Sequence, residues 1–207
     1  MERLSITERI RRSPVTSILI GINLMLFVIE TLAGGSTDTR VAVAFGAQAT
    51  PLLAMGQYWR LLTAMFLHFG ITHLACNMIS LFNLGPSLER VYGWRRFIAI
   101  YLISGLAGNL TTWYIELIRG DYAISAGASG AIFGLFGAYI ALALIPDIRR
   151  KLSVRGIVVT LVLNLAYGLT YPNINMAAHL GGLVGGAVTA GVMIMLIRAK
   201  SRAADRS

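Results

Sequence analysis

Long apolar stretches separated by short polar connections constrain this chain more than any other feature of its sequence. A helix needs roughly 20 apolar residues to cross the hydrocarbon core of a bilayer. Only 13% of the residues are charged, about half the share of ordinary soluble domains. We therefore predict an all-α polytopic membrane protein with a bundle of six transmembrane helices. The predicted spans are 15–32, 71–85, 97–118, 126–145, 156–170 and 176–197.

The spans and their connections differ in length. The stretches 71–85 and 156–170 are short for a bilayer, so we expect these helices to be tilted or shielded by neighbours. The long first connection (33–70) carries Trp59 and Arg60, a pairing common at the headgroup level. We expect this connection to lie in the membrane interface, and residues 1–207 to form one membrane domain.

The basic residues predict the orientation. Of the 18 Lys and Arg residues, 15 lie on one side, in the two terminal segments and in the connections after the second and fourth spans. The other side carries Arg40, Arg60 and Arg119. The positive-inside rule then places both termini in the cytoplasm. This clustering also indicates contact with a lipid bilayer and no nucleic-acid partner. The charge bias, with no transit peptide evident, favours a bacterial or archaeal plasma membrane.

Polar residues gather near the beginnings of the second, fourth and sixth spans. They are His73 with Asn77, the Gly-Ala-Ser-Gly segment 127–130, and His179. All three spans enter from the same side, so these residues are expected at one depth. Buried polar residues in a membrane are costly and are usually functional.

This layer suits acyl transfer. A serine hydroxyl becomes a nucleophile when a neighbouring histidine takes its proton, so we predict a catalytic dyad of Ser129 and His179. His73 and Asn77 lie about 40° apart on one helix face, where both could donate to an oxyanion. No Asp or Glu is expected at that depth, because Glu30 and Glu116 lie near the outer ends of other helices.

Each feature also has a structural interpretation. The segment 127–130 is typical of close helix packing, and His179 or Asn77 could bridge helices. His68, in the loop before the second span, is expected to make an interfacial hydrogen bond. A metal site is disfavoured, because His68 and His73 face different helix sides and no carboxylate completes the ligand set. Cys76 with His73 is a possible nucleophile pair, but the glycine-rich surroundings belong to Ser129.

Together these residues resemble the rhomboid family of intramembrane proteases. The matching motifs cover roughly 59–186 and are Trp59-Arg60, His73-x-x-x-Asn77, the Gly-x-Ser-Gly of 127–130, Ala178-His179 and Gly182-x-x-x-Gly186. Many members have a tyrosine four residues after the serine, where this chain has Phe133. The phenylalanine ring can still stack on His179.

The resemblance implies an intramembrane serine endopeptidase that acts on transmembrane protein substrates without a cofactor or metal. Ser129 would be the nucleophile, His179 the base, and His73, Asn77 and the Ser129 backbone amide the oxyanion hole. The alternatives are a transporter or channel, although the two halves show no repeat, and an inactive rhomboid-like protein that only binds and retains membrane clients. An inactive relative would lack the serine or the histidine.

The sequence also predicts how two helices meet. Gly130 with Gly134, and Gly182 with Gly186, each leave one helix face without side chains, which allows close approach in a membrane. We expect this contact to set the Ser129–His179 separation. Ala190 is expected on the outer face of the last helix.

Overall fold

The computed structural model describes residues 11–146 and 175–204, together with isolated positions at 8, 157, 160–162, 164 and 168. Every named element in this part of the chain is a helix, which confirms the all-α class. Most of the predicted span 156–170 lies outside the described residues. In chain order the elements are α2 (Pro14–Leu32), α3 (Thr39–Phe45), α4 (Thr50–Ala54), α5 (Arg60–Thr63), the 3-10 helix η1 (Ala64–Phe66), α6 (Gly70–Tyr92), α7 (Trp94–Arg119), α8 (Ser129–Ala143) and α11 (Met176–Ala204).

Three described helices are long and apolar enough to cross a membrane: α2, α7 and α11. A fourth span results if the residues Arg60–Phe66 and α6, which meet at 90°, are counted together. The helix α8 is apolar but has only 15 residues. The chain is therefore an all-α, multi-pass membrane protein.

Several helix boundaries differ from the predicted spans, and two of them have a local cause in the chain. The helix α6 has 23 residues and continues through Pro86 to Tyr92, beyond the predicted end of the span at residue 85. Membrane helices tolerate an internal proline because neighbouring groups satisfy the freed carbonyl. Conversely, α8 begins at Ser129 and not at residue 126, because Gly127 has a φ of +144° that no helix contains.

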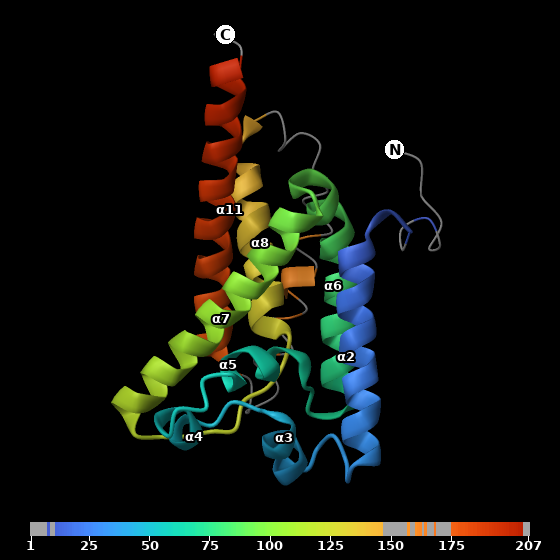
Figure 1. Cartoon of the computed structure of the whole chain (residues 1–207), viewed down its shortest axis with the longest axis vertical. Helices are drawn as coiled ribbons and strands as arrows, with labels where there is room; N and C mark the ends of the chain where they lie inside the picture. Colours follow the sequence, from blue (N-terminus) through green and yellow to red (C-terminus); the bar gives the residue numbers. More distant parts are fainter. Residues whose placement is uncertain are drawn as a thin grey trace.

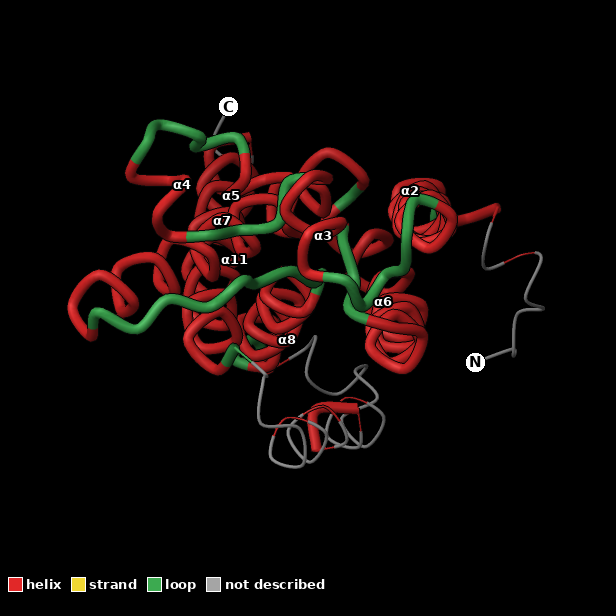
Figure 2. The backbone as a smooth tube through the Cα atoms, turned by 90° about the horizontal axis from the view of Figure 1, so that it is seen from below, coloured by secondary structure: helices red, strands yellow, loops and turns green. Residues whose placement is uncertain are grey.

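The long helices form two groups. Figure 1 shows α2 beside α6 on one side of the molecule and α7, α8 and α11 on the other; in Figure 2, α2 and α6 are again neighbours, seen end-on. The start of α2 and the end of α11 lie at one end of the molecule. The starts of α6, α8 and α11 lie toward the other end, beside the short helices of the first connection.

The glycine faces of α8 and α11 meet as predicted. A Cβ atom on Gly182 would collide with the carbonyl oxygen of Gly130, and one on Gly186 would collide with that of Gly134. Backbone therefore contacts backbone along this interface. Ala190 is 0% exposed, so its expected place on the outer face is wrong; by contrast, a Cβ on Gly191 would meet nothing within 4 Å.

A buried carboxylate joins α2 to α6. Glu89, near the end of α6, accepts hydrogen bonds from the backbone N–H groups of Val15 and Thr16 (both 2.9 Å) and from Thr16 Oγ1 (2.7 Å). These donors belong to the first turn of α2, which has no preceding carbonyls to bond. Close to this cap, a Cβ on Gly85 would lie 2.6 Å from the Thr16 methyl group.

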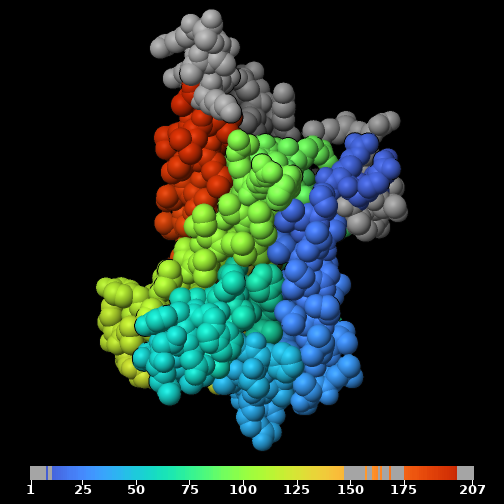
Figure 3. Space-filling model, viewed as in Figure 1, coloured from blue at the N-terminus to red at the C-terminus, as the bar shows by residue number. Residues whose placement is uncertain are grey.

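The first connection folds into α3, α4, α5 and η1 and covers the lower front of the molecule in Figure 3. Trp59 is 51% exposed, whereas Arg60 is 6% exposed. The Arg60 guanidinium lies 4.5 Å from the Trp59 ring centroid and donates to the carbonyls of Val43 (2.7 Å) and Ala47 (3.0 Å). Trp59 thus faces outward while Arg60 holds the connection together from inside.

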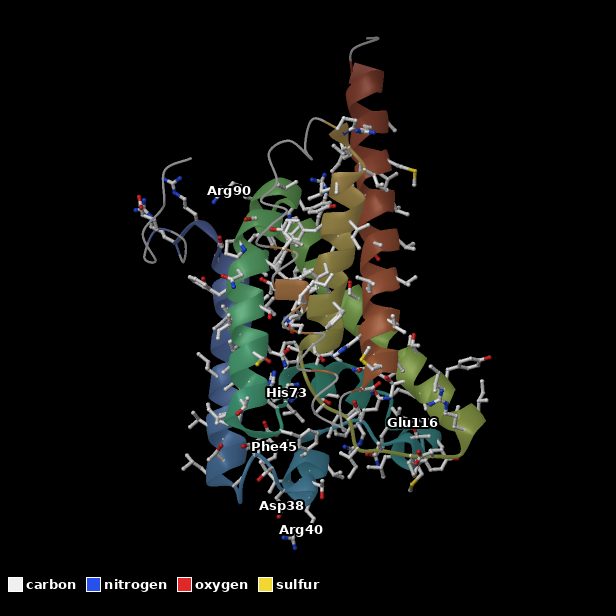
Figure 4. All side chains as sticks on the ribbon, turned by 180° about the vertical axis from the view of Figure 1, so that it is seen from behind. Asp38, Arg40, Phe45, His73, Arg90 and Glu116 are labelled. Carbon is white, nitrogen blue, oxygen red and sulfur yellow. The ribbon has the colours of Figure 1, made fainter. Side chains whose placement is uncertain are left out.

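An ion pair lies at the outer edge of the first connection, away from the long helices. Asp38 caps α3 by accepting from the Arg40 backbone N–H, and its carboxylate pairs with the Arg40 side chain at 2.7 Å. Figure 4 shows both side chains at the tip of the molecule. The hydrogen bonds from Arg40 lower the pKa of Asp38 to about 2, so this carboxylate stays ionised at neutral pH.

Candidate active site

Ser129 is the first residue of α8 and is half-buried. The segment before it is held against the first connection, because the Gly127 N–H donates to the Ala64 carbonyl of η1 at 2.8 Å. The positive φ of Gly127 turns the chain into the helix, and L side chains rarely adopt that conformation. The glycine therefore allows Ser129 to stand at a helix start instead of inside a helix.

His73 packs against this glycine. A Cβ atom on Gly127 would lie 2.8 Å from His73 Cε1, 2.9 Å from His73 Nε2 and 3.6 Å from Ser129 Oγ. The imidazole and the serine hydroxyl thus border the same small space, and Figure 4 shows His73 on the first turns of α6. Any side chain at position 127 would displace the His73 ring, whereas its Cβ would make an ordinary contact with Ser129 Oγ.

His179 lies on the first turn of α11 and is buried. Its ring stacks on Phe133 of α8, with ring centroids 4.0 Å apart and planes inclined by 9°. The stacking expected of Phe133 in the usual tyrosine position is therefore present. Stacked aromatic rings of this kind contribute about 0.5–1.5 kcal/mol beyond area burial.

The residues beside the serine and the histidine also touch. A Cβ on Gly130 would lie 3.4 Å from the Ala178 carbonyl oxygen, so the first turns of α8 and α11 are in contact. Within the described residues, His179 Nδ1 has no hydrogen-bond partner, and no hydrogen bond joins His179 to Ser129. The structure brings the two residues to adjoining helix starts without that bond.

Asn77 follows His73 by one helical turn and is 2% exposed. Its Nδ2 has no hydrogen-bond partner among the described residues. A buried amide that lacks a partner costs about 1–3 kcal/mol, so such a group usually has a function or an unseen partner. The Asn77 amide is therefore a buried donor without a described partner, near the start of α6.

His68 is buried and does not make the interfacial hydrogen bond that we expected. Its ring lies edge-on to His73 with centroids 5.1 Å apart, and neither ring nitrogen has a partner in the described part of the chain. The two histidines are neighbours because the chain turns sharply between η1 and α6. No group of three or more His, Cys, Asp or Glu residues suited to a metal occurs among the described residues. Cys76 is a half-buried free thiol.

A polar framework around the serine segment was not predicted. Gln48 pairs with Ser125 through two backbone hydrogen bonds of 2.9 Å, and Gln48 Nε2 donates to the Asn109 carbonyl at 3.0 Å. Asn175, just before α11, contacts Ser125 as well. The available signal was the position of Asn175, since asparagine is a preferred residue immediately before a helix.

These features define a class: an all-α, multi-pass membrane protein with a serine and three histidines gathered where several helices begin. The rhomboid domain model matches residues 55–196. This match covers more than half of the chain, and the chain belongs to the rhomboid family.

Similar proteins include bacterial rhomboid proteases. Rhomboid protease GluP of Bacillus subtilis (strain 168) is 41% identical over 182 residues, which cover 86% of this chain and 34% of GluP. YdcA, a second rhomboid protein of that organism, is 38% identical over 86% of this chain and 87% of its own length. Rhomboid protease AarA of Providencia stuartii is 32% identical over 92% of this chain and 76% of AarA. The chain thus spans about a third of GluP but most of the other two.

Proposed function

We propose that this protein is an intramembrane serine endopeptidase that uses Ser129 as nucleophile and His179 as general base. The observation that carries the proposal is the grouping around the start of α8. The His73 ring and Ser129 Oγ both border Gly127, while Phe133, one turn further, stacks on His179. Membership of a family with relatives named as proteases supports the same assignment.

In the first step, Ser129 Oγ attacks the carbonyl carbon of the scissile peptide bond, and its proton passes to His179 Nε2. This transfer requires the other ring proton on Nδ1, so that the Nε2 lone pair is free; Nδ1 has no hydrogen-bond partner among the described residues. The C–N bond then breaks as His179 returns the proton to the leaving amine. An ester on Ser129 remains, and His179 activates a water molecule that hydrolyses it.

The tetrahedral intermediate needs donors for its oxyanion. We assign this role to Asn77 Nδ2, the His73 ring and the Ser129 backbone amide. The free amide of Asn77 and the position of His73 beside Gly127 support the assignment. Loss of one such donor typically costs about 10²–10³ in rate.

The substrate would be the transmembrane segment of another membrane protein, in a helix that unwinds easily and has a small residue before the cut. We further propose six spans with both termini in the cytoplasm of a bacterial or archaeal plasma membrane. The 15-to-3 division of basic residues supports this topology, as does the position of the start of α2 and the end of α11 at one end of the molecule.

The decisive experiment uses purified full-length protein in detergent. We expect an activity-directed fluorophosphonate to label the wild type, and the wild type to cleave a model transmembrane substrate. Ser129→Ala and His179→Ala should abolish cleavage while the melting temperature is retained. Cleavage by a folded Ser129→Ala variant would rule out the nucleophile, and an unlabelled, inactive wild type would favour an inactive relative that only binds clients.

Two further variants test the oxyanion donors. Asn77→Ala and His73→Ala should each lower turnover by about 10²–10³ without abolishing it. Complete loss for Asn77→Ala in a folded protein would indicate a different role. A reporter fused after Ser207 tests the topology, since a signal from the outer side alone would contradict six spans.

A further inference from the structure

Asn175 immediately precedes α11 and lies four residues before His179. Its Oδ1 accepts hydrogen bonds from the Ala178 backbone N–H at 2.9 Å and from Thr112 Oγ1 of α7 at 3.1 Å. Its Nδ2 donates to Ser125 Oγ at 2.9 Å. Its carbonyl accepts from the His179 N–H at 3.2 Å. One residue thus joins the histidine helix, α7 and the serine segment.

The serine segment provides a fixed point for this contact. Ser125 is paired with Gln48 through two backbone hydrogen bonds, and the Gly127 N–H is bonded to Ala64. These bonds tie the segment to the first connection on both sides of position 126. A hydrogen bond from Asn175 to Ser125 therefore fixes α11 to a framework that is itself held in place.

The glycine contact between α8 and α11 does not by itself fix the position of α11 along its axis. Gly182 and Gly186 lie directly against the backbone of Gly130 and Gly134, so the contact fixes how closely the helices approach. Glycine faces carry few interlocking side chains to oppose sliding along the axis. A slip of one residue moves His179 by about 1.5 Å, more than a hydrogen bond of about 2.6–3.2 Å tolerates.

We infer that Asn175 is a positioning residue that fixes the axial register of α11, and so sets His179 opposite Ser129. Ser125 and Asn175 each lie four residues before one member of the proposed dyad, and the bond between their side chains couples the two segments. This inference rests on the proposed function.

The substitutions separate positioning from simple helix capping. Asn175→Ala removes every side-chain bond. Asn175→Asp keeps both acceptor roles, toward Ala178 and Thr112, and the Ser125 hydroxyl can rotate to donate to the new carboxylate. Ser125→Ala removes only the link to the serine segment and leaves the cap intact. Asn83→Ala, at an exposed position on α6, is the matched control.

The measurements are kcat and KM on a model transmembrane substrate, the rate of fluorophosphonate labelling, and the melting temperature. For Asn175→Ala we expect kcat and the labelling rate to fall about 10- to 100-fold, with KM within about twofold. Asn175→Asp should recover most of the activity. Ser125→Ala should lower kcat about three- to tenfold, which tests the inference even if Asn175→Ala fails to fold. Asn83→Ala should behave as wild type.

The possible failures are distinguishable. A wild type that neither labels nor cleaves refutes the proposed function, and the inference with it. An active wild type with normal kcat in both Asn175→Ala and Ser125→Ala refutes the positioning role alone. A lower melting temperature with unchanged kcat would identify Asn175 as a helix cap only, and Asn175→Asp as inactive as Asn175→Ala would contradict register control.

Discussion

The two helix groups of this protein are held together by different means. In the group α7–α8–α11, glycine brings main chains into direct contact: Cβ atoms on Gly108, Gly182 and Gly186 would each meet backbone of another helix of the group. The pair α2–α6 meets through side chains, because the Glu89 carboxylate caps the first turn of α2 and Thr16 lies against Gly85. In the first group the backbone contacts fix how closely the helices approach, whereas the polar anchor of the second group lies at one end of the pair.

This difference matters because the candidate site draws on both groups. Ser129 is the first residue of α8, and His179 lies on the first turn of α11. His73 and Asn77 lie on the first two turns of α6. The proposed nucleophile and base therefore lie in the group α7–α8–α11, whose helices contact one another through backbone. The proposed oxyanion donors sit on a helix whose polar anchor, Glu89, lies 16 residues away from His73, or about 24 Å along the axis. Damage to the two groups should have different consequences.

The largest effect is expected from Gly182→Val. The added side chain would collide with Gly130, push α11 away from α8 and separate Ser129 from His179. Misplacement by an ångström can cost about 10²-fold, so we expect kcat to fall at least that far. Gly191→Val on the same helix, where a Cβ meets nothing within 4 Å, is the matched control. Near-normal turnover of a folded Gly182→Val protein would refute the contact.

Glu89→Ala should affect stability more than chemistry. The substitution leaves two backbone N–H groups and one hydroxyl without their buried acceptor, which should lower the free energy of unfolding by about 2–4 kcal/mol. The kcat of the folded fraction should remain within about threefold, because Arg90, next to Glu89, and His73 lie toward opposite ends of α6 (Figure 4).

Two comparison variants complete that test. Glu89→Gln retains an oxygen acceptor and should lose less stability, and Asp121→Asn, in an exposed loop, should lose none. Unfolding is followed by denaturant titration in a fixed detergent. If Glu89→Ala lowered kcat as strongly as Gly182→Val, the two groups would not respond separately.

Arg60→Lys tests the connection that lies between the groups. The guanidinium donates from Nη1 to the carbonyls of Val43 and Ala47 and from Nε to Gln57 Oε1, and an ammonium group cannot reproduce that planar arrangement. We expect a loss of about 1–2 kcal/mol in the free energy of unfolding, with a smaller loss of activity. Arg40→Lys, whose side chain is exposed, should leave the melting temperature unchanged.

The smallest effect is expected from Phe133→Tyr. The stack on His179 is retained, so kcat should stay within about threefold of wild type. Phe133→Ala removes the stack and leaves a cavity, and should lower both kcat and stability. The test is to measure kcat for both variants and the wild type in the same assay. A strong loss in Phe133→Tyr would mean that the pocket around His179 has no space for the hydroxyl.

Sequence reasoning predicted the parts of the molecule that follow from composition and periodicity. The apolar stretch at 15–32 is nearly identical to α2, and the glycine pairs of α8 and α11 meet as expected. Boundaries failed where local rules compete. The span predicted at 71–85 stops before Pro86, although α6 continues through this proline to Tyr92. The span predicted at 126–145 includes Gly127, although the chain turns there and α8 begins at Ser129.

Within the candidate site, the sequence indicated which residues gather but not what supports them. The neighbourhood of His73, Gly127 and Ser129 could be expected from motif order and common depth. The bond between Asn175 and Ser125 could not, because it joins two segments 50 positions apart through ordinary polar side chains. His68 lies in the loop where it was expected, but the interfacial hydrogen bond predicted for its side chain is absent from the described residues, because its burial depends on the 90° turn between η1 and α6, which leaves no periodic signal.

The close fit of α11 between α7 and α8 has a consequence for the order of synthesis. The ribosome delivers α11 after α7 and α8, so the glycine-lined face that receives it is open to lipid or to other helices until that helix arrives. Ser129 is made 50 residues before His179, the general base that we propose for it. On the proposed function, the nascent chain can therefore not cleave its neighbours in the translocation channel, and proteolytic competence begins only when the last described helix inserts.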